Sequence, residues 1–92
     1  MNKSRRRKLV TNENALMQIY DALSQIRDNV ESLHSDEEEC IENTPESFQS
    51  GPRYENLQSA CELLEEAISA LDEAIENIEA AKEYMEDARN VD

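Results

Sequence analysis

Residues 67–88 read AISALDEAIENIEAAKEYMEDA, and this stretch decides the fold. Through the second half of the chain, apolar residues return at alternating intervals of four and three, and a charged residue fills only one position of the series. This is a heptad repeat with apolar a and d positions, which predicts a long helix packed lengthwise against another helix. The series is Leu57, Cys61, Leu64, Ile68, Leu71, Ile75, Ile78, Lys82 and Met85.

Small residues widen this apolar face. An alanine stands at the g position before each a, from Ala60 to Ala88, where its methyl group keeps helix propensity high and lets a neighbouring helix come close. A face this wide is more typical of a helix bundle than of a two-stranded coiled coil. The expected helix-packing and oligomer stripe consists of Leu63, Ala67, Ala70, Ala74, Ala81 and Tyr84.

The first half of the chain repeats the rhythm with polar residues at two positions. Its expected seam is Leu9, Asn12, Leu16, Ile19, Leu23, Ile26, Val30, Leu33, Glu37 and Cys40. The only glycine and both prolines lie at 43–52, so we expect helices over about 5–42 and 52–90 joined by a proline-containing turn at 43–51. The chain 1–92 is therefore expected to be one all-α domain, an antiparallel two-helix coiled-coil hairpin that dimerises into a four-helix bundle.

Polar residues in the two seams suggest a register. If the numbers of facing residues add up to 94, Asn12 lies opposite Lys82, whereas the neighbouring registers bury one of these two groups against isoleucine. An unpaired buried polar group costs about 1 to 3 kcal/mol, which favours this register. At the flanking positions Arg27 then lies beside Glu65 and Arg6 beside Glu86, although Glu13 faces Glu79.

The charge is strongly acidic and uneven. The chain has 22 acidic and 9 basic residues, a net charge of -13. Residues 1–34 hold six Lys or Arg and four Asp or Glu, while residues 35–92 hold three and eighteen. Such a field repels nucleic acids and anionic membranes and attracts basic partners. No apolar run approaches the roughly 20 residues that span a bilayer, so we expect a cytoplasmic protein with free thiols.

A row of carboxylates along the second helix is the candidate partner-binding surface. One interpretation is a solvated face that keeps a coiled coil soluble. The other is mimicry of nucleic acid, in which the carboxylates occupy a basic groove that normally binds phosphate. The candidate acidic face consists of Glu62, Glu65, Glu66, Asp72, Glu73, Glu76, Glu79 and Glu83.

The basic cluster Arg5, Arg6 and Arg7, flanked by Lys3 and Lys8, also has two interpretations. In a hairpin it lies beside the acidic end of the second helix, so the two ends can compensate each other's charge. The alternative is RNA binding by the basic end of a dimeric hairpin, although no aromatic residue is interleaved with these charges. Apart from that alternative, we do not expect direct nucleic-acid binding.

Nothing in the sequence predicts catalysis, a cofactor or a metal site. His34, Cys40 and Cys61 lack the spacing of zinc ligands, and the carboxylates of 36–39 radiate from a helix in different directions. No nucleophile has a base partner, and a filled seam offers no apolar pocket. We therefore expect a protein that is not an enzyme.

The basic start NKSRRRKL, the DEEE run, the turn ENTPESFQ with the following RYE, and EEAISALDEAIENIEAA carry a resemblance. They resemble short acidic helical-hairpin proteins of unassigned function from Gram-positive bacteria and their phages. The resemblance implies a bacterial host and a mobile-element setting, in which an acidic inhibitor of a DNA-targeting defence protein, such as an anti-CRISPR protein, would fit. The alternative expectation is a structural or assembly module that works through its apolar stripe.

Overall fold

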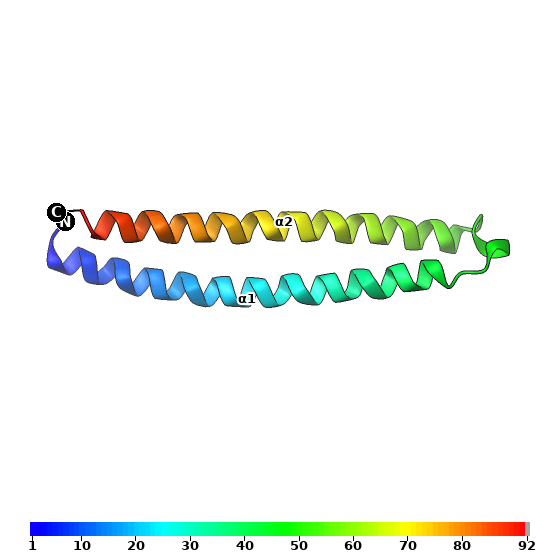
Figure 1. Ribbon diagram of the computed structural model, residues 1–92, viewed down its shortest axis with the longest axis horizontal. Coiled ribbons are helices and arrows are strands. Elements are labelled where there is room, and N and C mark those ends of the chain that lie inside the picture. Colours follow the sequence, from blue (N-terminus) through cyan, green and yellow to red (C-terminus); the bar gives the residue numbers. More distant parts are fainter. Residues whose placement is uncertain (92) are drawn as a thin grey trace.

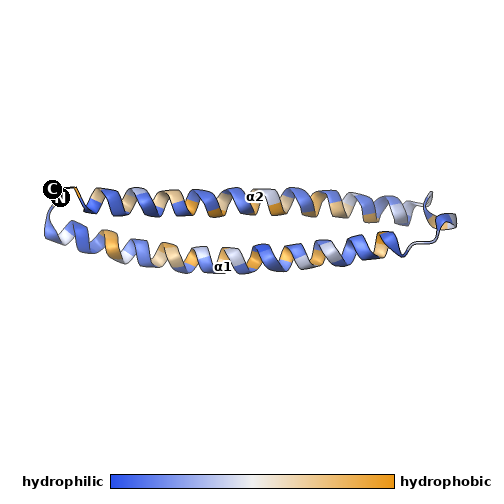
Figure 2. Cartoon of the chain, in the orientation of Figure 1, coloured by the Kyte–Doolittle hydropathy of each residue, from blue (hydrophilic) through white to orange (hydrophobic). Residues whose placement is uncertain are grey.

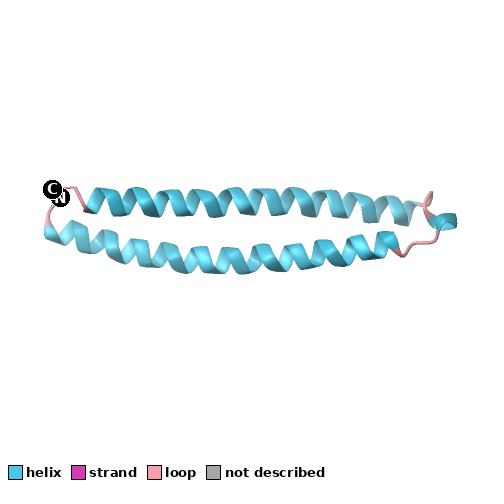
Figure 3. Ribbon diagram, viewed as in Figure 1, coloured by secondary structure: helices cyan, strands magenta, loops and turns pink. Residues whose placement is uncertain are grey.

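The computed structural model describes residues 1–91 and consists of two long helices joined by a short turn. Helix α1 spans Lys3–Glu42, the 3-10 helix η1 spans Glu46–Phe48, and α2 spans Pro52–Arg89. The long helices lie antiparallel along their whole length, with both chain ends at one tip and η1 at the other (Figure 1). No strand occurs in residues 1–91 (Figure 3). The all-α two-helix hairpin expected from the sequence is thus confirmed.

Local chemistry sets the helix ends close to the expected bounds. Asn2 caps α1, because its side-chain oxygen accepts a hydrogen bond of 2.8 Å from the backbone N–H of Arg5. The residue before a proline avoids helical geometry, and α1 stops two residues before Thr44, which precedes Pro45. Pro52 occupies the first turn of α2, where its missing N–H costs nothing. The prolines therefore fix both sides of the turn.

The inward side of α2 follows the predicted seam. Every position of the series from Leu57 to Met85 is buried or half-buried, and Cys61 is the most buried apolar residue of the described chain at 6% exposure. Tyr54 and Arg89 extend the same spacing toward the two ends of α2. The heptad interpretation of the second helix is confirmed.

The seam of α1 is rotated from the predicted one, and half of that prediction is wrong. The row of Leu9, Leu16, Leu23 and Val30 faces α2 as expected. The second inward row lies one residue later than predicted and contains Glu13, Tyr20, Arg27 and His34. The predicted row is exposed instead, with Ile19 at 54%, Ile26 at 48% and Leu33 at 56%. At 100° per residue this is a rotation of about 50° around the axis of α1.

The register of the two helices also differs from the predicted one. Hydrogen bonds join Tyr20 with Glu79, Arg27 with Asp72 and His34 with Glu65, so the numbers of these facing residues add up to 99. Arg27 thus meets a carboxylate one heptad beyond the predicted Glu65, and Glu13 bonds with Arg89 rather than facing Glu79. Asn12 is exposed and bonds to the backbone of its own helix.

The prediction failed because it assumed that the bulkiest apolar row must face inward. Helix α1 carries two candidate second rows beside its leucine row, one of isoleucine and leucine and one of polar and charged residues. The polar row pairs with complementary charges on α2, so its burial leaves few unsatisfied groups. The apolar row is thereby left on the surface of the hairpin.

Candidate functional site

One long side of the hairpin is held by polar contacts between the helices, and we call it the polar side. Tyr20 Oη donates to Glu79 Oε1 over 2.7 Å, Arg27 Nε donates to Asp72 Oδ1 over 2.8 Å, and His34 Nε2 lies 3.1 Å from Glu65 Oε1. These contacts recur every heptad because the participating residues are spaced by seven on each helix. Three residues of the candidate acidic face, namely Glu65, Asp72 and Glu79, are therefore engaged within the chain.

The polar side shifts the pKa of its donors. The hydrogen bond that Arg27 donates to Asp72 and the nearby negative charge raise the pKa of Arg27. The bond to Glu79 raises the pKa of the Tyr20 phenol, so this hydroxyl stays protonated and keeps donating to a higher pH than an ordinary tyrosine. At the end of the hairpin, Glu13 is only 4% exposed, and its hydrogen bonds with Arg89, at 2.8 and 3.1 Å, raise the pKa of that guanidinium.

The remaining candidate carboxylates project into solvent. Within residues 1–91 they are exposed and make neither a hydrogen bond nor an ion pair. They lie on the outer surface of α2, next to the polar side, because all Asp and Glu of this helix fall on three adjacent heptad rows. These free carboxylates are Glu62, Glu66, Glu73, Glu76 and Glu83.

The opposite long side carries no charge over most of its length. Each helix has rows of residues that flank its seam on this side. In an antiparallel pair these flanking rows of the two helices lie next to each other, away from the three polar contacts. On α1 these rows run from Asn12 to Leu33, and on α2 from Asn56 to Ala88. Apolar and polar residues alternate accordingly along both helices (Figure 2). This uncharged face consists of Asn12, Ala15, Ile19, Ala22, Ile26, Asn29 and Leu33 of α1, with Asn56, Ala60, Leu63, Ala67, Ala70, Ala74, Asn77, Ala81, Tyr84 and Ala88 of α2.

The uncharged face contains the whole stripe predicted for α2. Leu63 and Tyr84 are 70% and 75% exposed, while Ala67 and Ala74 are half-buried beside α1. Sequence reasoning missed the part of the face on α1, because it placed Ile19, Ile26 and Leu33 in the seam. The rotation of α1 depends on the pairing of Tyr20, Arg27 and His34 with carboxylates of α2. The pattern within one helix does not reveal such pairing.

The basic cluster lies at the tip that holds both chain ends. Arg6 is half-buried and donates from Nη2 to the backbone oxygen of Val91 over 2.9 Å. Lys3, Arg5, Arg7 and Lys8 are exposed, and within residues 1–91 none of them forms an ion pair. Within the described residues, Arg6 thus reaches only a neutral backbone oxygen beyond the end of α2, and no ion pair joins the basic cluster to the acidic side chains of that helix.

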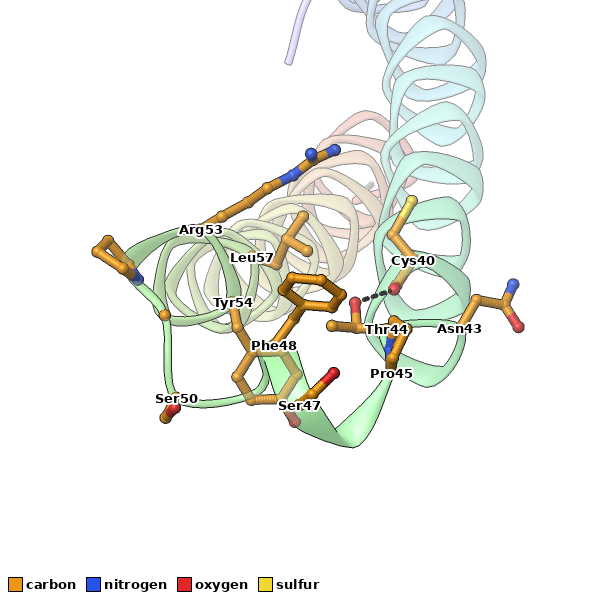
Figure 4. Close-up of a pocket in the computed structure, with 12 residues that line it drawn as sticks. Cys40, Asn43, Thr44, Pro45, Ser47, Phe48, Ser50, Arg53, Tyr54 and Leu57 are labelled. Carbon is orange, nitrogen blue, oxygen red and sulfur yellow. Dashed lines mark hydrogen bonds between the residues drawn. The ribbon is translucent and has the colours of Figure 1, made fainter.

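The turn contains a pocket that the sequence did not predict. It has a volume of about 650 Å³ and lies between the end of α1, η1 and the start of α2. Phe48, Tyr54 and Leu57 supply its apolar lining, and Thr44 closes one side by donating to the backbone oxygen of Cys40 over 2.7 Å (Figure 4). The pocket opens to solvent, and Phe48 is 66% exposed. The prediction concerned the seam between the helices alone, so the turn pocket lies outside it.

A histidine and two carboxylates meet on the polar side. Nε2 of His34 lies 3.3 Å from Glu38 Oε1 and 3.1 Å from Glu65 Oε1, and all three candidate ligand atoms lie within 4.8 Å of one another. This ligand set is one that a divalent metal accepts, so His34 is less isolated than the sequence suggested. Both carboxylates are more than half exposed, and hydrogen bonding to the shared Nε2 is sufficient to explain the cluster.

The two thiols have different surroundings. Cys61 is buried in the seam, and burial, reinforced by the charges of Glu37 and Glu38, raises the pKa of its thiol. Cys40 is exposed near the turn. Both cysteines are free. Cys61 is thus part of the packing, whereas Cys40 is open to reagents.

Comparison of the chain with protein-family models, with curated proteins and with solved structures finds no match. Among the described residues, neither helix is long and apolar enough to cross a membrane. Function must therefore be inferred from the two faces of the hairpin.

Proposed function

We propose that this chain is a non-enzymatic assembly module that binds a second copy of itself through the uncharged face. The product is a four-helix bundle whose free carboxylates point outward. The observation that supports this best is the segregation of charge: a chain with a net charge of -13 keeps most of one long side free of charged residues. Solubility alone does not require such a side, since it favours charge all around the surface.

The thin interior of the hairpin supports the same conclusion. Among residues 1–91, Cys61 is the only buried apolar residue, and no side chain is fully buried. A fold that buries so little apolar surface usually needs oligomerisation or another staple for stability. Exposed Ile19, Ile26 and Leu33 offer the apolar area that a second copy would bury.

The size of the uncharged face matches that of a stable interface. On α2 it runs over 56–88, about 48 Å at 1.5 Å per residue. The hairpin is about 15 Å wide. The face therefore covers about 700 Å², close to the roughly 800 Å² that each partner buries in a standard interface.

A matched pair of substitutions tests this function. Ala70 lies on the uncharged face and Ala80 on the outer acidic surface, and both are exposed on α2. Ala70→Glu places a charge in the proposed interface and is expected to abolish the dimer in analytical ultracentrifugation, while Ala80→Glu leaves it intact. Circular dichroism should show the same helicity for both variants, because the substitution changes helix propensity little. A native chain that stays monomeric at hundreds of micromolar would rule out the assembly function.

The free carboxylates favour a second candidate, an acidic inhibitor that occupies the basic groove of a nucleic-acid-handling protein. In a bacterial cytoplasm, a phage-encoded inhibitor of a defence nuclease would use this surface, as the resemblance to phage-associated hairpins suggests. Replacing the five free carboxylates by Gln removes charge without breaking an intrachain contact. Glu65 and Asp72 must be left unchanged in this test, since both hold the helices together.

The probe for this candidate is an RNA-guided DNA nuclease, with its binding to target DNA measured at increasing concentrations of the protein. The native chain should inhibit binding in a salt-sensitive way, and the five-Gln variant should not. Equal inhibition by both proteins would exclude the acidic surface as the site that binds the nuclease. RNA binding by the basic cluster is a weaker alternative, which a filter-binding assay with Arg5 and Arg7 changed to Ala examines directly.

A further inference from the structure

The two ends of α1 carry opposite charges that are mostly unpaired. At the tip with the chain ends, Lys3, Arg5, Arg7 and Lys8 are exposed and form no ion pair within residues 1–91. Near the turn, exposed Asp36, Glu39 and Glu42 of α1 are likewise without an ion pair in that range. The charged groups lie about 45 Å apart along α1, several times the Debye length at physiological salt, so they cannot neutralise each other within one copy.

We infer that the second copy docks with its long axis reversed, so that the basic tip of each chain lies beside the acidic turn end of the other. This orientation rests on the proposed self-assembly through the uncharged face and specifies its geometry. The alternative two-fold arrangement places the two basic tips together and the two acidic turn ends together. Unpaired like charges repel, so complementarity selects the reversed arrangement.

Residue sizes on the uncharged face agree with the reversed orientation. Two copies centred on Ala74 place α2 against the partner's α2 in antiparallel contact, with the alanine row of one chain on that of the other. Leu63 then lies beside the partner's Tyr84, because their positions are nearly equally far from the centre, at eleven and ten residues. Small residues at the centre allow the backbones to approach closely, and the large residues fill the space toward both ends.

The first helices pair in the same way. Residue 24 faces Ala74 within the hairpin, so it is the centre of the contact between α1 and the partner's α1. This centre places Ile26 against the partner's Ala22 and Leu33 against the partner's Ala15. Ile26 and Leu33 thus each meet an alanine, while Ile19 meets the partner's Asn29. In the same register Lys8 faces the partner's Cys40 and lies near the partner's Asp36.

Cysteine cross-linking distinguishes the two orientations. In the double variant Lys8→Cys, Cys61→Ala, positions 8 and 40 are about 48 Å apart within one copy, too far for a short bismaleimide reagent to join them. Only the reversed dimer brings them together between copies. We expect a covalent dimer, with peptide mapping of the 8–40 link, and no link in the matched Cys61→Ala variant that keeps Lys8.

Sedimentation of the same double variant shows whether the chain dimerises at all. It therefore tests self-assembly separately from the reversed orientation. A dimer that gives no 8–40 link, or that links Cys40 to the partner's Cys40, overturns the reversed orientation and leaves self-assembly intact. A monomer overturns both.

A charge reversal provides an independent measurement. Changing Lys3, Arg5 and Arg7 to Glu should weaken the dimer about tenfold or more at low salt, and changing Asp36, Glu39 and Glu42 to Lys in the same chain should restore it. Arg6 is left unchanged because it bonds to Val91. A dissociation constant that is unaffected by the first set, or not rescued by the second, contradicts the inference.

Discussion

Helices α1 and α2 are nearly equal in length, yet they use their apolar residues differently. Helix α2 directs its leucine and isoleucine row inward and its alanines to the flank. Helix α1 directs its leucines inward, but it buries Glu13 and leaves Ile19, Ile26 and Leu33 exposed. Within the hairpin α1 is therefore held partly by polar contacts, and much of its apolar area remains available to another surface.

The difference shows that the apolar pattern of one helix does not by itself decide which of its rows faces a neighbouring helix. Helix α2 has a wide uncharged sector that can serve both the seam and the adjoining face. Helix α1 has three rows that could face inward, and only two of them contact α2. The contact with α2 therefore decides which row stays exposed. The following experiments test whether the two helices differ in this way.

The largest expected effect comes from the inward row of α2. Leu71→Ala removes a seam side chain and should lower the free energy of unfolding by about 2 kcal/mol at any protein concentration. The matched variant Ile26→Ala should cost less than about 0.5 kcal/mol in dilute monomer and more as concentration rises, because its surface is buried only on assembly. Urea unfolding at two concentrations measures both. An equal, concentration-independent loss would place Ile26 in the hairpin seam.

A smaller effect is expected from the buried carboxylate of α1. Glu13→Ala leaves Arg89 without its partner, and because that guanidinium is 31% exposed and can reach water, the cost should be only about 1 kcal/mol. The control is Glu83→Ala, an exposed carboxylate of α2 that is expected to change stability little. Thermal unfolding in which the two variants shift the midpoint equally would contradict the burial of Glu13.

Alkaline pH should weaken the hairpin through two protonated groups. The folded pKa values of Tyr20 and Cys61 lie above their ordinary values, the first through the bond to Glu79 and the second through burial. Their contributions are therefore complete below the unfolded pKa values and are lost as pH rises above about 9. In Tyr20→Phe the loss between pH 9 and 11 should be shallower than in the native chain. Identical pH profiles would exclude Tyr20 from the contact.

The smallest perturbation is chemical labelling of the thiols. Raising the pKa of Cys61 lowers its thiolate fraction, and burial blocks access, so a thiol reagent at pH 8 should modify Cys40 first. Cys61 should react only at the rate of transient opening, and addition of urea should remove the difference. Equal rates in native buffer would show that the seam around Cys61 is open.

The sequence by itself determined the helices, their ends and the inward face of α2. Prolines and a glycine fixed the turn, and the apolar series from Leu57 to Met85, interrupted only at Lys82, left α2 a single way to face inward. Because all acids of α2 fall on three adjacent rows, the acidic surface was also readable from the sequence. These features are local, since each depends on residues within one helix or one turn.

Tertiary structure alone decided the rotation of α1, the register and the uncharged face. Two rows of α1 could have met α2, and the choice depended on pairing Arg27 with Asp72 and Glu13 with Arg89, residues 45 and 76 positions apart. Such contacts couple the two helices energetically, so neither helix's own pattern contains them. The same coupling left Ile19, Ile26 and Leu33 beside the alanines of α2, where they form the proposed site of self-assembly.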